Sequence, residues 1–453
     1  MDCYIGIDLG STTTKAIFID TDEKILGRGI TNSRSNYDIA CQVASEEAEI
    51  NSRFALLQRW VKEDAGFKGV ADDLLAWLEA KYKLAQHLKQ LTALTEACYL
   101  DPLVVNKDPE WSHVPGLLAE IFERMEKDAH EIFLPNVKSR SDFFRDIASS
   151  CFMTCVEELA KNDSRLFDKL IGIYDRAILR VESQSYASFF DEYIHWACEE
   201  IVKMPQFSKY EGQIRAVTDR VASLEFNPLN TIGTGYGRQR LPFPKEQIRS
   251  EILCHGLGAH YMFPNTRTVL DIGGQDTKAI QVDGQGIVTN FQMNDRCAAG
   301  CGRYLGYIAD EMNMGVHELG PMAMKSNKQV KINSTCTVFA GTELRERLSL
   351  GERREDILAG LHRAMILRAM SLLARSGGID DEFTFTGGVA KNQAAVTALE
   401  KLVEENYGKR ILNISADSIY TGALGAALFA KRDKKGEMAK LDLKQLNKKV
   451  ATH

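Results

Sequence analysis

The sequence predicts an α/β protein in which one strand–turn–strand unit occurs twice, with a helical segment inserted between the two copies. Two observations predict this arrangement. β-Rich runs flank a small polar turn near the N-terminus, and the same pattern returns near residue 270. Between them, apolar residues recur with helical spacing. We therefore expect the first part of an α/β core at 1–45, a helical insert at 46–225, the remainder of the core at 226–430 and a basic C-terminal tail at 431–453.

Length and composition are those of a soluble globular protein. At 453 residues the chain is too long for one hydrophobic core, and two or three domains are expected. The net charge of −6 without a basic face argues against a nucleic-acid partner. No apolar run approaches the roughly 20 residues of a membrane helix, and the N-terminus enters a strand without a signal-peptide pattern. We expect a cytoplasmic protein without a nucleic-acid or membrane partner, whose ten cysteines stay reduced.

The first strand–turn–strand unit covers Tyr4 to Asp20. Tyr4 to Ile7 and Ala16 to Ile19 are β-rich, and the small polar residues between them predict a hairpin turn. Gly10 lets the backbone approach a ligand, and Ser11 to Thr14 supply hydroxyls and N–H groups that suit phosphate oxygens. This turn is not a P-loop, which needs Gly-x-x-x-x-Gly-Lys-Ser/Thr between a strand and a helix.

The second unit, Val269 to Asp283, matches the first at one constant offset. The identical pairs are Asp8 and Asp271, Gly10 and Gly273, Thr14 and Thr277, Lys15 and Lys278, Ala16 and Ala279, Ile17 and Ile280, and Asp20 and Asp283. A duplicated unit implies two similar domains, and two such turns that face each other can hold the phosphates of a nucleotide. Asp8 and Asp271, at the ends of their first strands, would then lie near a phosphate-bound Mg²⁺ or an attacking water.

The insert is predicted to be helical. Dense helix signals between the two halves of a duplicated β unit indicate an inserted domain. Cys151 and Cys155 lie one turn apart in it, and we interpret them as packing residues because no second pair is near. Helices are expected at Gly116 to Phe133, Ser141 to Ala160, Leu166 to Val181, Tyr186 to Lys203 and Gly212 to Ser223.

After the insert the pattern returns to α/β. A helix is expected over Lys245 to Met262, with Glu251 and His255 on one face, and we interpret these two as a surface pair or a hinge contact. A second, amphipathic helix is expected over Asp356 to Ser376.

A short predicted strand, Phe383 to Thr386, leads directly into Gly387 and Gly388. A double glycine between a strand and a helix lets the backbone pack under a flat ring. These two glycines are therefore a candidate adenosine site.

Two cysteine-containing stretches, Asn294 to Arg303 and Ser334 to Phe339, carry the strongest chemical signal. Cys297 and Cys336 each lie among small and hydroxyl residues before a predicted helix start. In that setting a sulfur can meet solvent or a metal while backbone N–H groups point at it. A [4Fe–4S] cluster takes four thiolates, so these two would be half a site and a second subunit would bring the other pair.

Together these motifs resemble the actin/Hsp70/sugar-kinase ATPase fold, because Asp8-x-Gly-Ser-Thr, Asp271-x-Gly-Gly-Gln and Gly387-Gly388 occur in that order. The two cysteine stretches are similar to the cluster-binding segments of the ATP-dependent activators of 2-hydroxyacyl-CoA dehydratases and of the related ATPase subunits of benzoyl-CoA reductases. The resemblance covers residues 1–35 and about 230–430. It implies an α/β fold with duplicated β-hairpin phosphate sites and a helical insert.

The resemblance also implies site residues and cofactors. Cys297 and Cys336 match the two ligands that each subunit gives to one [4Fe–4S] cluster at a dimer interface. Asp8, Asp271 and Gln275 are the expected catalytic residues. Cys301 falls where the activators have a non-thiol residue, and it either tunes the cluster or is incidental. ATP and Mg²⁺ are expected, with contacts at Gly10, Ser11, Thr12, Thr13, Thr14, Lys15, Gly273, Gly274, Gln275, Gly387, Gly388, Lys391 and Asn392.

The function implied by the resemblance is that of a redox ATPase. Reduced ferredoxin would charge the shared cluster, and ATP hydrolysis would change the angle of the helices after the two cysteines. The electron would then pass to catalytic subunits that reduce a CoA thioester. The insert is similar to that of the larger ATPase subunits of class I benzoyl-CoA reductases, which pair with a shorter homologous ATPase subunit. Because the short dehydratase activators lack such an insert, the resemblance favours an ATP-driven electron-transfer subunit of benzoyl-CoA reductase. A homodimeric dehydratase activator, a sugar- or acid-kinase-like phosphotransferase and a non-enzymatic assembly or chaperone-type ATPase are the alternative hypotheses.

Overall fold

The chain divides into two compact units, one formed by Glu49–Glu225 with Met1 and the other by Asp2–Ala48 with Phe226–His453. Helix α1 (Tyr37–Glu63) contributes to both units. The computed structural model describes residues 1–33, 36–106, 109–135, 137, 144–161, 163–182, 189–235, 241–295, 297–328, 330–332 and 337–434.

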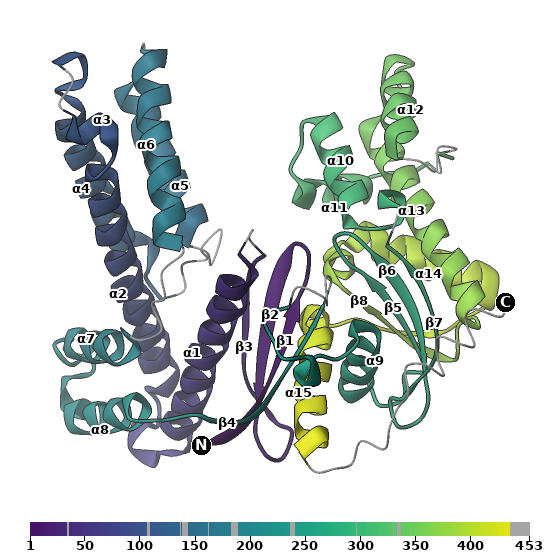
Figure 1. Ribbon diagram of the computed structural model, residues 1–453, viewed down its shortest axis with the longest axis horizontal. Coiled ribbons are helices and arrows are strands. Elements are labelled where there is room, and N and C mark those ends of the chain that lie inside the picture. Colours follow the sequence, from purple (N-terminus) through teal and green to yellow (C-terminus); the bar gives the residue numbers. More distant parts are fainter. Residues whose placement is uncertain are drawn as a thin grey trace. The chain divides into compact units, whose positions relative to one another are not determined.

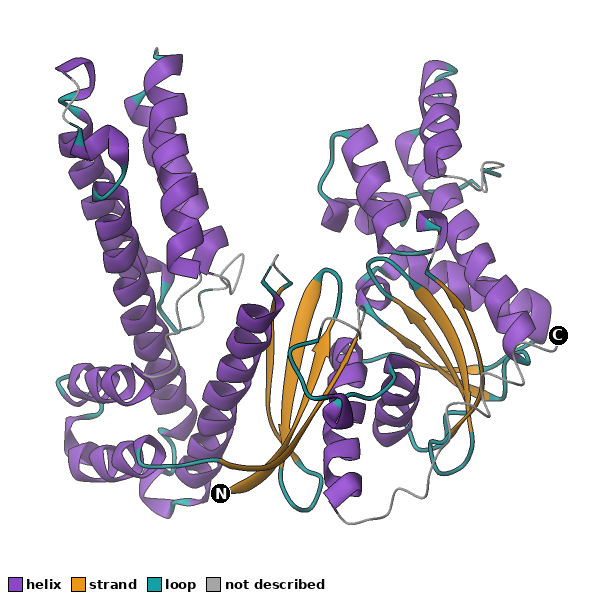
Figure 2. Cartoon of the chain, viewed as in Figure 1, coloured by secondary structure: helices purple, strands orange, loops and turns teal. Residues whose placement is uncertain are grey.

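The first unit is helical in its described part (Figure 2). One hydrophobic cluster is centred on Phe152 and Leu170, and another on Phe67, Tyr82 and Tyr193. Each helix expected here has a counterpart whose described ends agree within a few residues. The helices that follow α1 are α2 (Ala71–Tyr99), α3 (Pro102–Val105), α4 (Val114–Ile132), α5 (Phe144–Leu159), α6 (Ser164–Glu182), α7 (Phe190–Val202) and α8 (Glu211–Ala222).

The second unit holds two sheets. The first has the strand order β3-β2-β1-β4, in which β1 pairs antiparallel with β2 and parallel with β4. The second has the order β7-β6-β5-β8-β9, in which β5 pairs antiparallel with β6 and parallel with β8. The strands are β1 (Asp2–Leu9), β2 (Thr13–Ile19), β3 (Ile25–Asn32), β4 (Asn227–Gly235), β5 (Thr268–Ile272), β6 (Thr277–Val282), β7 (Val288–Asn294), β8 (Glu382–Thr386) and β9 (Ile411–Asn413).

The two sheets share the same hairpin register and the same turn hydrogen bond. Asp8 lies opposite Lys15 in the β1–β2 ladder, as Asp271 lies opposite Lys278 in the β5–β6 ladder. The Gly10 N–H donates to the Thr13 carbonyl (3.2 Å), and the Gly273 N–H donates to the Asp276 carbonyl (3.0 Å). The duplication predicted from matching residues is therefore confirmed in both the strand register and the turn.

Helices α9 (Glu251–Met262) and α15 (Thr421–Lys434) lie side by side between the two sheets (Figure 1). Between β7 and β9 in sequence the chain forms further helices, of which α13 packs on β6 and β7. They are α10 (Gly302–Met312), α11 (Val316–Ala323), α12 (Thr337–Ser349), α13 (Arg354–Ser376) and α14 (Gln393–Tyr407).

The predicted helix over 245–262 begins six residues later than expected. Lys245–Gln247 is a short 3-10 turn, and Ile248 then forms a β-bridge with Gly233. Because a bridging residue is extended, α9 can begin only after it, at Glu251.

Helix α13 is the one described helix long and apolar enough to cross a membrane, but 61% of its apolar window is buried inside the fold. Leu361, Met365 and Ala369 belong to the hydrophobic cluster that also contains Phe383 and Phe385 of β8. Such burial is typical of a core helix, so the helix is weak evidence for a membrane segment.

Glycines let α15 pack closely against its neighbours. A Cβ added at Gly425 would lie 1.9 Å from the Cys254 carbonyl oxygen of α9, and one added at Gly6 of β1 would lie 2.0 Å from the Ala423 carbonyl oxygen of α15. The neighbouring atoms are backbone and cannot turn aside, so only glycine fits.

Gly425→Ala is expected to lower the free energy of unfolding by about 1–3 kcal/mol, because the added methyl forces α9 and α15 apart. Gly306→Ala in α10 is the control, since a Cβ there would meet no atom within 4 Å. That change should be neutral or stabilise by up to about 1 kcal/mol, because alanine favours a helix. Urea unfolding of both variants makes the comparison, and equal effects would contradict the packing argument.

Candidate nucleotide and cysteine site

The two glycine-containing turns meet. A Cβ added at Gly274, in the second turn, would lie 2.4 Å from Thr12 Oγ1 and 3.9 Å from Ser11 Oγ of the first turn. The second turn therefore approaches the hydroxyls of the first as closely as a glycine allows. The sequence predicted turns that face each other, and the structure brings these segments together.

The first turn is braced by Ser33, which follows β3. The Ser33 N–H donates to the Thr12 carbonyl (2.8 Å), and the Ser33 hydroxyl donates to the Gly10 carbonyl (2.5 Å). Thr14 is buried, and its hydroxyl bonds that of Ser33 (2.9 Å), so its side chain supports the turn from beneath. Ser11 and Thr13 are half-buried and Thr12 is exposed, and their groups lie at the surface of the turn.

Lys15 brings a cation to this turn. Its Nζ lies 3.8 Å from Asp8 Oδ2, and a Cβ added at Gly10 would lie 3.3 Å from Nζ. The Lys15 side chain is 14% exposed, whereas that of Asp8 is 6% exposed. One carboxylate at the long end of ion-pair distance leaves donors on the ammonium for a second anion beside the turn.

Lys278, the equivalent residue in the second turn, is fully enclosed by carboxylates. Its Nζ lies 2.8 Å from Asp276, 3.3 Å from Asp271 and 3.9 Å from Glu251. Burial acts to lower the pKa of Lys278, but Asp271, Glu251 and Asp276 outweigh it and hold that pKa above its ordinary value. The two duplicated lysines have therefore diverged, one toward the turn surface and one into a buried ion network.

Asp271 lies in the same network. Its Oδ1 accepts a hydrogen bond from the Thr386 hydroxyl (2.8 Å), and His255 Nδ1 lies 3.7 Å from the same oxygen. Burial acts to raise the pKa of Asp271, but His255 and Lys278 outweigh it and hold that pKa below its ordinary value. Asp271 is thus kept ionised at the end of β5.

The interpretation of Glu251 and His255 as a surface pair was wrong. They are 5% and 7% exposed, because α9 lies between the two sheets. His255 Nδ1 lies 3.0 Å from Thr421 Oγ1 at the start of α15. A Cβ added at Gly422 would lie 2.7 Å from Asp8 Oδ2 and 3.1 Å from His255 Nε2. Gly422 therefore lets α15 begin where Asp8 and His255 converge.

The two glycines after β8 have different roles. Gly387 has φ +87°, and a Cβ there would lie 2.3 Å from the Ile272 carbonyl oxygen; Gly235 after β4 repeats this, with φ +124° and 2.2 Å to the Leu9 carbonyl oxygen. A glycine is needed at Gly387 and at Gly235, because at each position the end of one strand lies against the backbone of its parallel neighbour. Gly388 is exposed, and a Cβ there would meet no atom within 4 Å, so a planar group has access to its backbone.

Lys391 and Asn392 follow this turn. Lys391 is exposed. Asn392 caps α14, since its Oδ1 accepts from the N–H groups of Ala394 (3.0 Å) and Ala395 (3.3 Å), while its Nδ2 lies 3.0 Å from His362 Nε2. The structure thus gives Asn392 a supporting role beneath the turn.

The cysteine segment is bound directly to the second turn. The Gly302 N–H donates to the Gly273 carbonyl and the Arg303 N–H donates to the Gly274 carbonyl, each at 2.8 Å. The Thr277 hydroxyl donates to the Gly300 carbonyl at 2.5 Å. Since Gly302 is the first residue of α10, this helix starts on the predicted phosphate turn.

Cys297 is half-buried just ahead of that helix, and Arg368 Nη1 of α13 lies 3.7 Å from its Sγ. Cys301 is fully buried, its thiol donates to the Ala298 carbonyl (3.3 Å), and burial raises its pKa. Cys336 lies outside the described residues. No group of three or more His, Cys, Asp or Glu with metal-binding geometry occurs within the part of the chain that is described.

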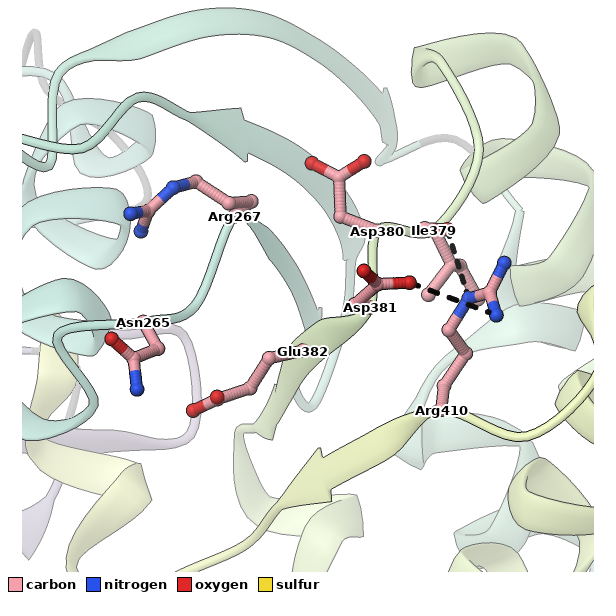
Figure 3. Close-up of a pocket in the computed structure, with 7 residues that line it drawn as sticks. All are labelled: Asn265, Arg267, Ile379, Asp380, Asp381, Glu382 and Arg410. Carbon is pink, nitrogen blue, oxygen red and sulfur yellow. Dashed lines mark hydrogen bonds and ion pairs between the residues drawn. The ribbon is translucent and has the colours of Figure 1, made fainter.

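A separate cavity of about 400 Å³ opens where β5 and β8 begin (Figure 3). Asp271 and Thr386 lie instead where these strands end. Arg267 and Glu382 face it, and Arg410 lies 3.9 Å from Asp381 at its edge. Its position separates it from the two turns.

The sequence profile described as the BadF/BadG/BcrA/BcrD ATPase family matches residues 5–430. The chain belongs to this ATPase family. Its nucleotide is therefore ATP. The membership confirms the family part of the resemblance predicted from the cysteine and glycine motifs.

Curated relatives lie on both branches of that resemblance. The (R)-2-hydroxyglutaryl-CoA dehydratase activating ATPase of Acidaminococcus fermentans is 46% identical over 200 residues, which are 44% of this chain and 74% of the relative. The 2-hydroxyisocaproyl-CoA dehydratase activator of Clostridioides difficile is 42% identical over 197 residues, 44% and 71% of the two chains. A benzoyl-CoA reductase subunit of Thauera aromatica is 33% identical over 208 residues, 46% and 73% of the two chains.

The crystal structure of component A of the Acidaminococcus fermentans (R)-2-hydroxyglutaryl-CoA dehydratase aligns over 96% of this chain and 100% of its own, with a TM-score of 0.53 and 24% identity. That likeness shows a shared fold. The predicted fold class, an α/β ATPase of the actin/Hsp70/sugar-kinase type, is confirmed.

Sequence reasoning missed Ser33, Glu251, His255, Thr386 and Arg368 as parts of this site. Glu251 and His255 carried a signal, their i, i+4 spacing, but spacing alone does not say that a helix is buried between two sheets. Thr386 directly precedes the Gly387–Gly388 motif, but that motif does not reveal its bond to Asp271. No motif marks Ser33 or Arg368.

Replacing Lys15 and replacing Lys278 are expected to have different effects. Lys15→Met should weaken ATP binding about 10- to 100-fold, the loss of one charge-assisted phosphate contact of about 1.5–3 kcal/mol. Lys278→Met should instead lower the free energy of unfolding by about 3–5 kcal/mol, because it leaves buried carboxylates without their cation. Calorimetric ATP titration and urea unfolding of both variants distinguish the roles, and a greater loss of stability in Lys15→Met than in Lys278→Met would contradict the assignment.

Proposed function

We propose that this chain is the ATP-hydrolysing component of a redox system that delivers low-potential electrons to an enzyme acting on a CoA thioester. One observation carries the proposal: main-chain hydrogen bonds join the second phosphate turn to the helix that begins beside Cys297. A cysteine segment held in this way can respond to events at the turn, which is what an ATP-driven electron carrier requires. The names of the related activators, which include an activating ATPase of a dehydratase, support the same conclusion.

In the nucleotide half, the first turn would hold the phosphates through the backbone and hydroxyls of Ser11 to Thr13, with Lys15 as the cation. Asp8 and Asp271, buried at the strand ends, would orient Mg²⁺ and the attacking water, and Gln275 of the second turn would assist. The open backbone at Gly388 would lie under the adenine ring.

In the cysteine half, Cys297 and Cys336 would be this chain's two ligands to a [4Fe–4S] cluster, which supplies one-electron transfer when bound. The described residues fit an anionic group of that kind. Cys297 is half-buried, and a guanidinium from Arg368 lies beside its sulfur. Cys301, turned inward to the Ala298 carbonyl, is not proposed as a ligand.

The coupling between the two halves would run through α10 and α12. A change at Gly273 and Gly274 on hydrolysis would be transmitted to Gly302 and Arg303, the first turn of α10. Helices α10 and α12 pack together, since a Cβ added at Gly341 would lie 2.5 Å from the Tyr307 hydroxyl oxygen. Arg345 and Glu311 add an ion pair between them. The two helices that follow the proposed ligands would therefore move together.

A partner subunit would complete the cluster. Phe339, three residues after Cys336 on α12, is 67% exposed, and an exposed aromatic side chain beside a proposed half-site supports a subunit contact there. The higher identity to dehydratase activators (46% and 42%, against 33% for the benzoyl-CoA reductase relative) favours a dehydratase as the acceptor. The larger ATPase subunit of benzoyl-CoA reductase, with a shorter partner subunit and reduced ferredoxin as donor, stays the second candidate because of the helical unit.

Iron content tests the proposal. Protein purified anaerobically with its partner should hold about four iron ions per dimer. Cys297→Ala and Cys336→Ala should each remove most of the iron, whereas Cys155→Ala in the helical unit should retain it. If the chain were a kinase-like or an assembly ATPase, neither the wild-type protein nor these variants would hold iron. That result would refute the redox function.

The subunits that co-purify with the chain distinguish the two redox candidates. A second copy of this chain together with a dehydratase is expected for the activator. A shorter homologous ATPase subunit together with thioester-reducing subunits would instead support the reductase.

Gly302→Pro tests the coupling. Proline is tolerated as the first residue of a helix, and the extended Cys301 (φ −132°, ψ 178°) suits the position before it. The proline ring puts a carbon where the N–H donated to Gly273, so the Gly273 carbonyl must move away from α10. The nucleotide-dependent change in hydrogen exchange of α10 should fall several-fold, and calorimetric titration checks that ATP still binds. Gly302→Ala is the control for added bulk, because its Cβ would lie 3.1 Å from the same carbonyl oxygen while the N–H is kept, and it should retain that change. An unaltered response in Gly302→Pro would exclude this route.

A further inference from the structure

Arg368 of α13 is a charged residue beside Cys297, and it forms no ion pair with a carboxylate of the described residues. Its Nη1 lies 3.7 Å from Cys297 Sγ, within hydrogen-bonding distance of a sulfur. Its Nε is buried and has no hydrogen-bond partner in the described part of the chain. Buried polar groups are nearly always paired, so an orphaned donor beside a proposed metal ligand points to an acceptor that completes the site.

Arg363 shows what an ordinary arginine does on this helix. It lies five residues earlier and makes two hydrogen bonds to Glu405, at 3.3 Å and 2.7 Å. Within the described residues Arg368 forms no such pair with Asp or Glu. The guanidinium of Arg368, which is always charged, is therefore available to the sulfur of Cys297.

The position of Arg368 is set by rigid packing. Its neighbours on α13, Met365 and Ala369, are buried in the hydrophobic cluster of the second sheet. On its other side, a Cβ added at Gly300 would lie 3.7 Å from Arg368 Cβ, so the arginine stem lies against the cysteine segment. Tyr304 of α10 is also buried, and its hydroxyl has no partner among the described residues. It lies near enough for Arg368 to oppose the rise that burial causes in the tyrosine pKa.

We propose that Arg368 is a positioning residue that holds the Cys297 sulfur and raises the reduction potential of the cluster bound there. The inference rests on the proposed redox function. A fixed positive charge and N–H donors to the ligand sulfur favour the more negative, reduced state of an iron–sulfur site. Arg368 would therefore let a donor load the electron before ATP lowers the potential.

Three variants test this in the anaerobic protein with its partner: Arg368→Gln, Arg368→Lys and, as the matched control, Arg363→Gln. Arg368→Gln should retain iron but lower the equilibrium constant for one-electron reduction about tenfold, a shift of about 59 mV to more negative potential. Arg368→Lys, which keeps the charge but not the planar fork, should shift the potential less. Arg363→Gln should leave it unchanged. Redox titration followed by electron paramagnetic resonance measures all three.

The outcomes separate this inference from the function on which it rests. Wild-type protein without iron would refute the redox function, and the role of Arg368 with it. Iron-loaded Arg368→Gln and Arg368→Lys with the wild-type potential would overturn the inference alone. If Arg368→Gln does not fold, the charge-conserving Arg368→Lys decides, because a merely structural arginine would change stability without shifting the potential.

Discussion

The buried ammonium of Lys278 is the interaction on which the site depends. Three carboxylates, from Asp271, Asp276 and Glu251, lie within 3.9 Å of it. Burying that much negative charge without a cation would cost several kcal/mol for each ion. The network fixes residues on both sides of the second turn. It also joins α9, which carries Glu251, to the second sheet.

From that turn the rest of the site extends in two directions. Toward the first sheet, Gly274 contacts the hydroxyl-rich first turn, and the ammonium of Lys15 lies beside that turn. Toward the C-terminal helices, Gly273 and Gly274 accept the N–H groups that begin α10. A short rigid element between the proposed phosphate site and Cys297 can pass a displacement from one to the other, because close-packed cores transmit strain and do not absorb it.

The two copies of the duplicated unit share their backbone geometry, but their lysines have different surroundings. Both copies keep the Asp–Lys ladder pair, the same turn hydrogen bond and a glycine where the parallel strand ends. In the first copy the lysine stays at the turn surface, while in the second two further carboxylates, Asp276 and Glu251, enclose it. The position matched to Asp276 is Thr13, whose hydroxyl cannot balance an ammonium.

The strands, the turns and the duplicated unit could be predicted because each is encoded locally. β-Rich runs around a small polar turn specify a hairpin, and the match of Asp8 to Asp271 and Gly10 to Gly273 in one register reveals the repeat. The start of α9 could not be predicted, because Ile248 is extended by a bridge to the distant Gly233. Nor could Asn392 be seen as a helix cap that also meets His362.

The sequence by itself determined the α/β class, the duplicated turns and the two cysteine stretches, since these depend on residues close together in the chain. Only the tertiary structure decided which lysine is buried, that His255 lies beside Asp271, and that Arg368 reaches Cys297 from 71 residues away. Burial and ion pairing are properties of the assembled core. They arise when α9, α13 and α15 pack against sheets formed by other parts of the chain, and no local pattern of residues specifies that meeting.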